Sequence, residues 1–301
     1  MNELKKKEAA AIAALKTFEP EEGYHLCYSG GKDSDVIRIL ASLAGVKHDI
    51  VHNLTTVDAP ETVQYIKSID NIIINKARYA DGKHKTMWNL IIARGMPPLR
   101  KMRYCCEELK EQGGKGRLKI TGVRAAESKA RAENGGEIKI IGKPKTVQKY
   151  LTQNSINFQQ TPKGGVVLNF DNSESRRAVE HCFRTTSTML NPILSWTEKD
   201  VWEFLKFYGC KSNPLYQCGW KRIGCIGCPM QTKKGMRHDF QQYPKYYYNY
   251  IRAFDRLVKS LNEKGLNPRW QSGEEVMRWW VSDVNEIWGQ KLFEGFDLLD
   301  V

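Results

Sequence analysis

The chain has 301 residues, of which 41% are hydrophobic and 10% aromatic, so it can bury a large core and intrinsic disorder is excluded. Its 47 Lys and Arg residues against 34 Asp and Glu residues give a formal net charge of +13. This charge favours a polyanionic partner such as a nucleic acid, with a merely basic protein as the alternative. No segment approaches the roughly 18 apolar residues of a membrane span, and the N-terminal residues lack the apolar core of a signal peptide. We therefore expect a cytoplasmic protein without membrane contact, whose eight cysteines are thiols or metal ligands rather than disulfides.

Short apolar runs alternate with helical patterns along the first half of the chain. Residues 1–22 predict a short amphipathic helix. The expected strands cover 25–28, 47–54, 70–77 and 117–123, and helices are expected over 35–45 and 60–69. Because helices of about ten residues separate the strands, we expect an α/β fold with a doubly wound, mostly parallel sheet.

Three later segments complete the chain. Residues 132–176 are rich in Gly, Asn, Lys and Ser, and we expect an insertion or a mobile flap there. Thr197 and Asp200 have the spacing of a capping box before an apolar stripe, which predicts a helix. The resulting division is an N-terminal helix (1–22), an α/β domain (23–215) and a cysteine-loop and helical C-terminal region (216–301).

A glycine-rich turn with the sequence SGGKDS, residues 29–34, joins the first expected strand to the first expected helix. The backbone N–H groups of such a turn and the dipole of the helix attract an anion, and Lys32 adds a full positive charge. The spelling differs from the Walker pattern GxxxxGK[ST]. Ligands of open α/β sheets bind at the carboxyl ends of strands, so we expect a phosphate-binding loop here. The alternative is a turn that merely joins strand to helix.

This loop resembles the pyrophosphate loop of the ATP-pyrophosphatase and sulfonucleotide reductase superfamily. Further segments resemble, in the same order, motifs of its phosphoadenosine phosphosulfate reductase-like branch. They are LTTVDAPET (54–62), TGVRAAESKAR (121–131), NPILSWTEKDVWEFL (191–205) and NPLYQCGWKRIGCIGCP (213–229). The resemblance implies an adenine nucleotide alpha-hydrolase-like fold and makes residues 23–215 a nucleotide-binding domain.

The resemblance also implies what this site holds: ATP, or a nucleotide of the adenylylsulfate type, together with Mg²⁺, for which Asp33 is a candidate ligand. The implied catalytic residues are Lys32, Asp33 and Arg124, since loss of pyrophosphate builds negative charge that needs a positive clamp. The implied nucleotide-binding residues are Ser29, Gly30, Gly31, Lys32, Asp33, Ser34, Asp58, Arg124, Glu127, Ser128 and Arg131. We expect Arg124 and Arg131 to share one face of a helix, because their spacing matches two turns. The alternative is two solvated arginines paired with Glu127 and Glu133.

Three cysteines, Cys218, Cys225 and Cys228, lie in one short loop whose glycines permit tight turns, and Cys105 is the natural fourth ligand. Four thiolates can hold zinc or an iron-sulfur cluster, and their spacing does not separate the two. The family resemblance favours a 4Fe-4S cluster, with zinc as the alternative. A further alternative is that these cysteines are only buried small hydrophobic residues. We expect the remaining cysteines, Cys27, Cys182 and Cys210, in the core.

Cys106, adjacent to Cys105, makes a fifth candidate for four ligand positions. The pattern of the assimilatory reductases implies Cys105, Cys106, Cys225 and Cys228, whereas that of the DNA phosphorothioation enzymes implies Cys105, Cys218, Cys225 and Cys228. We favour the second set, because the three-cysteine loop is compact and its closure costs little entropy.

The resemblance leaves several functions open. Assimilatory reductases of this kind use a nucleophilic cysteine near the C-terminus, and here no cysteine follows Cys228. We therefore expect an enzyme that adenylates a substrate oxygen with ATP, releases pyrophosphate and lets a cluster-delivered sulfur displace AMP. The alternatives are reduction of adenylylsulfate or phosphoadenylylsulfate to sulfite, and a non-catalytic, metal-stapled nucleic-acid-binding module.

The expected partners follow from charge and composition. The segments YPKYYYNYIRAFDR (243–256) and RWQSGEEVMRWW (269–280) combine rings for stacking with cations for phosphates, which indicates a nucleic-acid substrate. The same aromatic residues would equally suit an ordinary helix core. A sulfur donor such as a cysteine desulfurase and a homo-oligomer are further expectations.

Overall fold

The computed structural model describes residues 2–141, 144–168, 179 and 187–282. They form two compact units, which we describe separately. The first unit comprises Met1–Asn53, Pro60–Asn75 and Gln112–Ile223, and the second comprises Leu54–Ala59, Lys76–Glu111 and Gly224–Val301.

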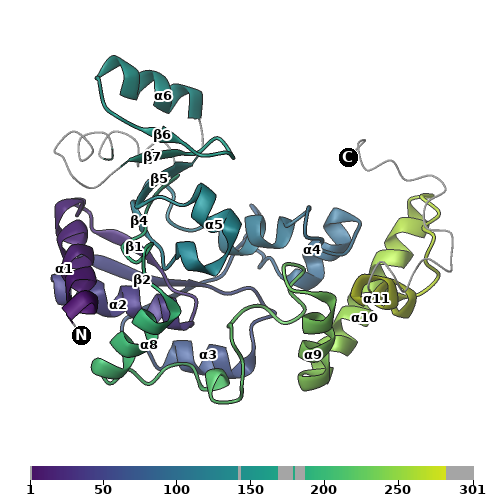
Figure 1. The fold of residues 1–301 in the computed structure, drawn as a ribbon. Helices are drawn as coiled ribbons and strands as arrows, with labels where there is room; N and C mark the ends of the chain where they lie inside the picture. Colours follow the sequence, from purple (N-terminus) through teal and green to yellow (C-terminus); the bar gives the residue numbers. More distant parts are fainter. Residues whose placement is uncertain (1, 142–143, 169–178, 180–186, 283–301) are drawn as a thin grey trace. The chain divides into compact units, whose positions relative to one another are not determined.

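The first unit is built on one mixed sheet of eight strands, in the order β3-β2-β1-β4-β8-β5-β7-β6 (Figure 1). The strands β1, β2, β3, β4 and β8 pair in parallel, and β5, β6 and β7 are antiparallel. Their bounds are β1 Tyr24–Cys27, β2 His48–Asn53, β3 Ile72–Asn75, β4 Lys119–Ile120, β5 Ile138–Ile141, β6 Gln159–Gln160, β7 Val166–Leu168 and β8 Ser187–Leu190. The predicted α/β fold with a mostly parallel sheet is confirmed.

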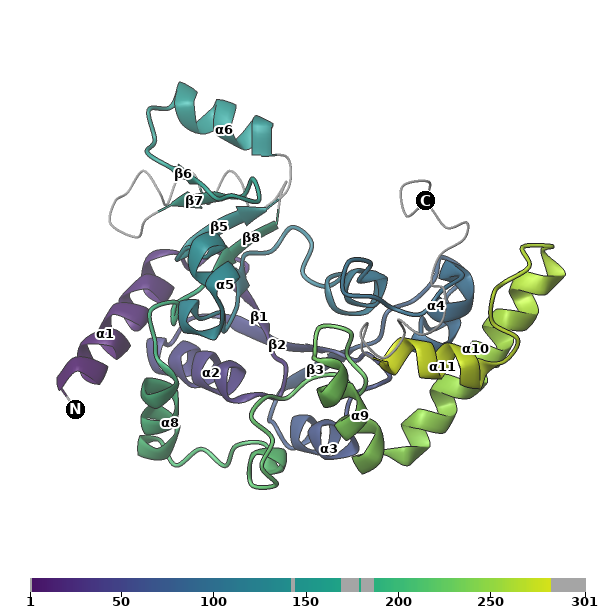
Figure 2. The ribbon, with the colours of Figure 1, turned by 45° about the vertical axis from the view of Figure 1, so that its right-hand side comes forward.

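The helices of this unit flank the sheet. They are α1 Asn2–Thr17, α2 Lys32–Ala44, α3 Pro60–Lys67, α5 Lys129–Asn134, α6 Pro144–Gln153 and α8 Glu198–Phe207. Helices α1 and α8 both pack against α2 (Figures 1 and 2). The capping box predicted from Thr197 and Asp200 is present at the start of α8, where each side chain accepts a hydrogen bond from the other residue's backbone N–H.

The core of the first unit explains why these elements form. Helix α2 buries Val36, Ile37 and Leu40 completely, at the i, i+1 and i+4 positions of one helical face, against the sheet. Parallel strands covered on both faces read as apolar runs. The fully buried side chains Leu26 of β1 and Ile120 of β4 fit that rule.

Part of the segment 132–176 extends the sheet. Strand β5 pairs with β8 and β7 in antiparallel fashion, and Ile138 and Ile140 alternate into the core. This alternation is typical of a strand with one buried face. The residues around β5 are polar, but these two isoleucines are enough to place the strand in the sheet. Residues 169–176 lie outside the described part.

The second unit is helical. Its elements are α4 Met87–Arg94, a short π-helix Cys106–Lys110, α9 Lys233–Gln242, α10 Pro244–Glu263 and α11 Gly273–Val281. Aromatic side chains make its core, since Tyr250, Phe254 and Trp280 are buried and their rings are in mutual contact. These three aromatic residues therefore belong to the core between the helices, which is the second of the two interpretations given above for this region. Among the described residues, no helix combines the length and apolar character needed to cross a bilayer.

Candidate functional site

The glycine-rich loop joins the carboxyl end of β1 to the first turn of α2, as predicted. Gly30 has φ +74°, and an added Cβ would come within 3.0 Å of Ile66. The Ser34 hydroxyl accepts from Gly31 N (3.1 Å) and donates to Gly31 O (2.6 Å), and Asn213 Nδ2 donates to Gly30 O (3.1 Å). The loop is thus fixed from both sides, with the N-terminus of a 13-residue helix behind it.

Two cations and two carboxylates meet at this helix start. Arg124 Nε lies 2.6 Å from Asp33 Oδ1, and another Arg124 nitrogen lies 2.9 Å from Glu198 Oε2. Lys32 Nζ lies 3.4 Å from Glu198 Oε1 and 3.8 Å from Asp33 Oδ2. The side chains of Arg124 and Lys32 are only 3% and 6% exposed, whereas that of Glu198 is 57% exposed. The structure therefore brings the three predicted catalytic residues together and adds Glu198, which the sequence analysis missed.

The two cations change the pKa of Glu198. Its burial favours the neutral acid, but the charges of Lys32 and Arg124 outweigh that effect, so the pKa of Glu198 is lowered. Glu198 is therefore ionised at neutral pH and partly neutralises the two cations.

A cavity of about 910 Å³ opens beside Lys32. Glu198, Trp202, Asn213 and Tyr216 are among the residues that line it. The Lys32 ammonium lies 5.3 Å from the centroid of the Tyr216 ring, and the Tyr216 hydroxyl accepts from Lys32 N at 3.0 Å. A cavity of this size, with a buried ammonium in contact with two of its lining residues, Glu198 and Tyr216, suits a nucleotide-sized ligand.

These lining residues were missed as site residues, although the sequence signal was present. Trp202 belongs to the NPILSWTEKDVWEFL segment, and Asn213 and Tyr216 belong to NPLY. Gly122 was missed in the same way: a Cβ there would lie 2.9 Å from the backbone of Asp33, so only glycine lets the loop after β4 approach the phosphate loop.

The expected helix from Arg124 to Arg131 is wrong. A 3-10 turn covers Ala125–Glu127, and the chain becomes extended at Ser128 (φ −169°, ψ 153°) before α5 begins. The Ser128 side chain serves as the N-cap of α5, where it accepts from Arg131 N. Glu127 pairs with Arg131 and accepts from Arg124 N at 3.2 Å. The charges of Asp33 and Arg124 still act on Arg131, whose pKa is lowered mainly by burial, so both arginines belong to the same region.

A buried carboxylate lies behind the loop. Asp35 is completely buried on α2, and its Oδ1 accepts from the hydroxyls of Tyr28 (2.6 Å) and Tyr65 (2.9 Å). Burial raises the pKa of Asp35 to about 6, although both tyrosines favour the ionised form. Asp35 faces the core and holds α2 in place rather than contacting the cavity.

Four of the candidate ligands gather in the second unit. Cys105 precedes the π-helix that begins at Cys106, and its pKa is raised by its hydrogen bond with Cys106, by burial and by the charges of Cys225 and Cys228. The same bond lowers the pKa of Cys106. Cys105 and Cys225 are buried, and Cys106 and Cys228 are half-buried. Within the described ranges, no three His, Cys, Asp or Glu side chains are close enough to hold a metal ion.

Polar neighbours surround this thiol group. The Cys225 thiol donates to Thr55 Oγ1 at 3.4 Å, and the Thr55 backbone N–H donates to Asp58 at 2.7 Å. Lys110, a neighbour that the sequence analysis missed, has a raised pKa, chiefly because it lies close enough to Cys225 to be stabilised by a thiolate there. Asp58, expected at the nucleotide, thus belongs to the unit of the thiols, where its backbone bridges to Cys225.

The other cysteines lie elsewhere. Cys218 belongs to the first unit, where it is exposed. Cys27, expected in the core, is half-buried, and burial raises its pKa to about 11. Cys210 is half-buried beside Arg38 and Asp35. Cys182 lies outside the described residues.

Known proteins have sequences similar to this chain, over most of its length or over a short part of it. The chain is 25% identical over 260 residues to an uncharacterised 37.8 kDa protein of Escherichia phage 186, which covers 79% of this chain and 75% of the phage protein. It is 21% identical over 276 residues to an uncharacterised protein of Methanocaldococcus jannaschii, covering 84% of this chain and 54% of that protein. Adenosine 5'-phosphosulfate reductase of Burkholderia cepacia is 42% identical, but over 45 residues, 15% of this chain and 18% of the reductase. The chain thus spans about half the length of the archaeal relative and less than a fifth of the reductase.

Solved structures and a family match complete the comparison. The crystal structure of phosphoadenylyl-sulfate reductase from Candida auris, a phosphate complex, aligns with a TM-score of 0.42 and 13% identity over 74% of this chain and 93% of that one. Candida glabrata FMN adenylyltransferase aligns with a TM-score of 0.43 and 12% identity over 80% of this chain and 72% of that one. The sequence model described as "Phosphoadenosine phosphosulfate reductase domain" matches residues 23–231, well over half of the chain. The chain therefore belongs to the phosphoadenosine phosphosulfate reductase domain family.

Proposed function

We propose that this protein is an ATP-dependent sulfurtransferase that acts on nucleic acid. A substrate oxygen attacks the α-phosphorus of ATP, and the bond to pyrophosphate breaks. A sulfur nucleophile then displaces AMP, which leaves with that oxygen. A donor such as a cysteine desulfurase supplies the sulfur, together with a thiol reductant.

The observation that carries this proposal is the pair of buried cations, Lys32 and Arg124, at the start of α2. Two nearly buried positive charges beside a helix N-terminus and a nucleotide-sized cavity suit a group with several phosphates. Pyrophosphate carries more charge as it leaves than while it is bonded, so fixed cations stabilise its departure. Asp33 is the candidate Mg²⁺ ligand, because its carboxylate belongs to the loop and lies beside both cations.

The thiol group fits an iron-sulfur cluster in its donor chemistry. We propose Cys105, Cys106, Cys225 and Cys228 as the ligands, because the charges of the other three all act on Cys105. The set with Cys218 in place of Cys106, favoured on spacing, is the alternative. A 4Fe-4S cluster would supply a site that binds or delivers sulfur. The chain's own residues set its surroundings, with Lys110 placing a positive charge next to Cys225.

Reduction of adenylylsulfate or phosphoadenylylsulfate is the second candidate, because the short match to the Burkholderia cepacia enzyme carries that activity in its name. It would need a thiol to attack the sulfonate, and residues 229–301 hold no cysteine. Sulfite formed from either nucleotide with thioredoxin as the donor would establish this activity in place of sulfur transfer.

Anaerobic purification followed by iron and sulfide assays and visible absorption tests the metal. Pyrophosphate release from ATP, with and without single-stranded DNA, duplex DNA or transfer RNA, tests the reaction. We expect brown protein and pyrophosphate release that depends on nucleic acid. Colourless, zinc-loaded protein would contradict the iron-sulfur part, and the absence of release with every nucleic acid would contradict the substrate.

A further inference from the structure

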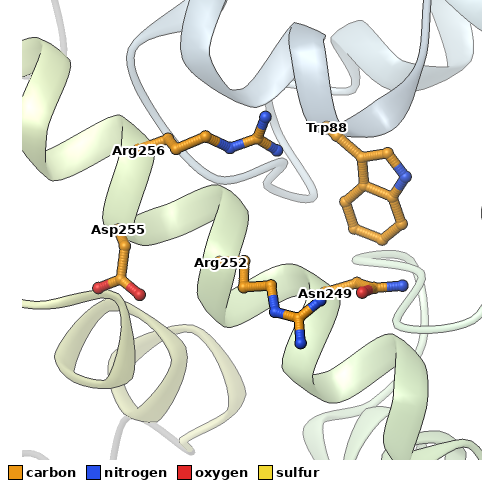
Figure 3. A pocket seen from close by; sticks show the side chains of 5 residues that line it. All are labelled: Trp88, Asn249, Arg252, Asp255 and Arg256. Carbon is orange, nitrogen blue, oxygen red and sulfur yellow. The ribbon is translucent and has the colours of Figure 1, made fainter.

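A second cavity lies in the second unit, between α4 and α10. Trp88 of α4 and Asn249, Arg252, Asp255 and Arg256 of α10 line about 560 Å³. Figure 3 shows the indole of Trp88 extending from α4 toward α10, with Asp255 directed away from it. The cavity thus combines one large aromatic ring with two guanidinium groups.

The two arginines belong to a longer basic stripe. Lys245, Asn249, Arg252, Arg256 and Lys259 follow one another at intervals of four, three, four and three residues, which places them on one face of α10. The opposite face is the apolar one, with Tyr250, Ala253, Phe254, Leu257 and Val258 buried. At 1.5 Å per residue, the stripe is roughly 21 Å long, enough to follow an extended polyanion.

This face differs from an ordinary solvated helix surface. Such surfaces usually alternate in charge and pair at i, i+4, as Lys199 does with Glu203. Within the stripe, Lys259 is paired in this way with Glu263, whereas the two arginines of the cavity are not. Arg252 and Arg256 are exposed, and neither forms an ion pair with a carboxylate in the part of the chain that the structure describes. The carboxylate of Asp255, between them in sequence, instead accepts from Gly273 N at 2.6 Å. Two adjacent guanidinium groups therefore remain available to an anionic ligand.

Trp88 supplies the second half of the site. Its ring is half-buried and packs at 74° against Tyr250, with 5.0 Å between the ring centroids, so the indole is held in one orientation. A fixed indole at the wall of a cavity is a platform for a nucleobase, and guanidinium groups bind phosphate oxygens in pairs. A base can stack on a side chain only when it is unpaired, which favours a single strand over a duplex.

We propose that this cavity and the basic stripe of α10 bind single-stranded nucleic acid, with a base stacked on Trp88 and phosphates on Arg252 and Arg256. DNA and RNA share this chemistry. The inference rests on the proposed function for the role of nucleic acid as substrate, but the binding itself requires no nucleotide at the phosphate loop.

The test uses fluorescence anisotropy of labelled single-stranded DNA, single-stranded RNA and duplex DNA, titrated with the full chain at several salt concentrations. The variant Arg252→Gln/Arg256→Gln should weaken single-strand binding about tenfold or more and lower the salt dependence by about 1.4 in log–log slope, since each phosphate contact contributes about 0.7. The matched control is Lys145→Gln/Lys149→Gln, which removes two exposed positive charges at the same spacing from α6. We expect the control to bind as the unmodified chain does.

Trp88→Leu keeps an apolar side chain but removes the stacking surface, and we expect single-strand binding about five- to hundredfold weaker, with duplex binding unchanged. Thermal melting shows whether Trp88→Leu is folded. The variant of the two exposed arginines tests the site independently of this substitution. Equal weakening by the arginine pair and by the control pair would overturn the proposal, as would duplex binding as tight as single-strand binding.

The two proposals fail in different ways. Single-strand binding that depends on Trp88 and the arginines, without any pyrophosphate release, would leave this site standing and remove the proposed reaction. Pyrophosphate release stimulated by nucleic acid, but insensitive to the arginine pair, would keep the reaction and overturn this site.

Discussion

The guanidinium of Arg124 and the carboxylate of Asp33 approach to 2.6 Å, which joins the loop after β4 to the phosphate loop after β1. Gly122 makes this approach possible, because its missing side chain leaves room for the backbone of Asp33. Arg124 and Lys32 also share the carboxylate of Glu198. A phosphate that binds these cations therefore competes with two carboxylates already present, and this competition can be measured.

Replacing Lys32 should remove most of the affinity for ATP. Lys32→Met keeps the apolar stem but deletes the buried ammonium beside the cavity, and a hydrogen bond to a charged group is worth about 1.5–3 kcal/mol. We expect binding about ten- to hundredfold weaker in calorimetric titration, with unchanged iron content. Lys199→Met, on the exposed face of α8, is the control. Unaltered ATP affinity in Lys32→Met would contradict the assignment of the loop.

Replacing Glu198 should have the opposite effect. Glu198→Gln removes the charge that partly neutralises Lys32 and Arg124, so ATP should bind about two- to tenfold more tightly, the modest size reflecting the exposure of this carboxylate. Glu203→Gln, further along α8 and paired with Lys199, should leave the affinity unchanged. Weaker binding by Glu198→Gln would instead mean that this carboxylate contacts the nucleotide or its Mg²⁺.

Local sequence patterns predicted the loop but not its network. The turn from Ser29 to Ser34 and the capping box of Thr197 are set by residues close in sequence, so both were predictable. Glu198 is simply the first residue of a helix, and only the folded chain brings it to Arg124. The spacing of Arg124 and Arg131 suggested a continuous helix, but the side chain of Ser128 caps a new one instead, because serine competes for backbone hydrogen bonds.

For the thiols and the sheet, too, the sequence predicted some features and missed others. Spacing marked Cys225 and Cys228, yet Cys106 became prominent only through its bond with Cys105 at the start of the π-helix. The alternation of Ile138 and Ile140 is short, and its neighbours in the sheet come from distant β7 and β8, so composition alone suggested an insertion. Contacts between residues far apart in sequence thus decided the position of Glu198 and the place of β5 in the sheet, whereas the cap at Ser128 and the bond between Cys105 and Cys106 are local.

Cysteine substitutions separate the two ligand sets. Because Cys105 interacts with Cys106, Cys225 and Cys228, we expect Cys106→Ser and Cys225→Ser to lose most of their iron on anaerobic purification. Cys218→Ser, which changes an exposed thiol of the other unit, should retain it. Iron and sulfide per chain are the measurement, with Cys27→Ser as the control for a thiol outside both ligand sets. Loss in Cys218→Ser with retention in Cys106→Ser would select the other set.

The buried carboxylate of Asp35 should make stability depend on pH. Its pKa is about 6 in the folded chain against 3.8 for the ordinary side chain, because burial penalises the charged form. The folded chain therefore binds the proton more tightly, and this contribution to stability is complete below about pH 4 and is lost as the pH rises through 6. The difference corresponds to about 3 kcal/mol.

Asp35→Asn should remove this dependence on pH, since an amide does not titrate. The N–H groups of the new amide have no hydrogen-bond acceptor, so the absolute stability of the variant is not the quantity to compare. The measurement is the free energy of unfolding in urea between pH 4 and 8, compared as a slope rather than as an absolute value. His25 acts in the opposite direction, because burial lowers its pKa to about 4, so its contribution falls as the pH drops below 6.5. In Asp35→Asn the stability should therefore fall toward acid pH more steeply than in the unmodified chain. An unchanged slope would show that Asp35 is ionised in the folded protein throughout this range.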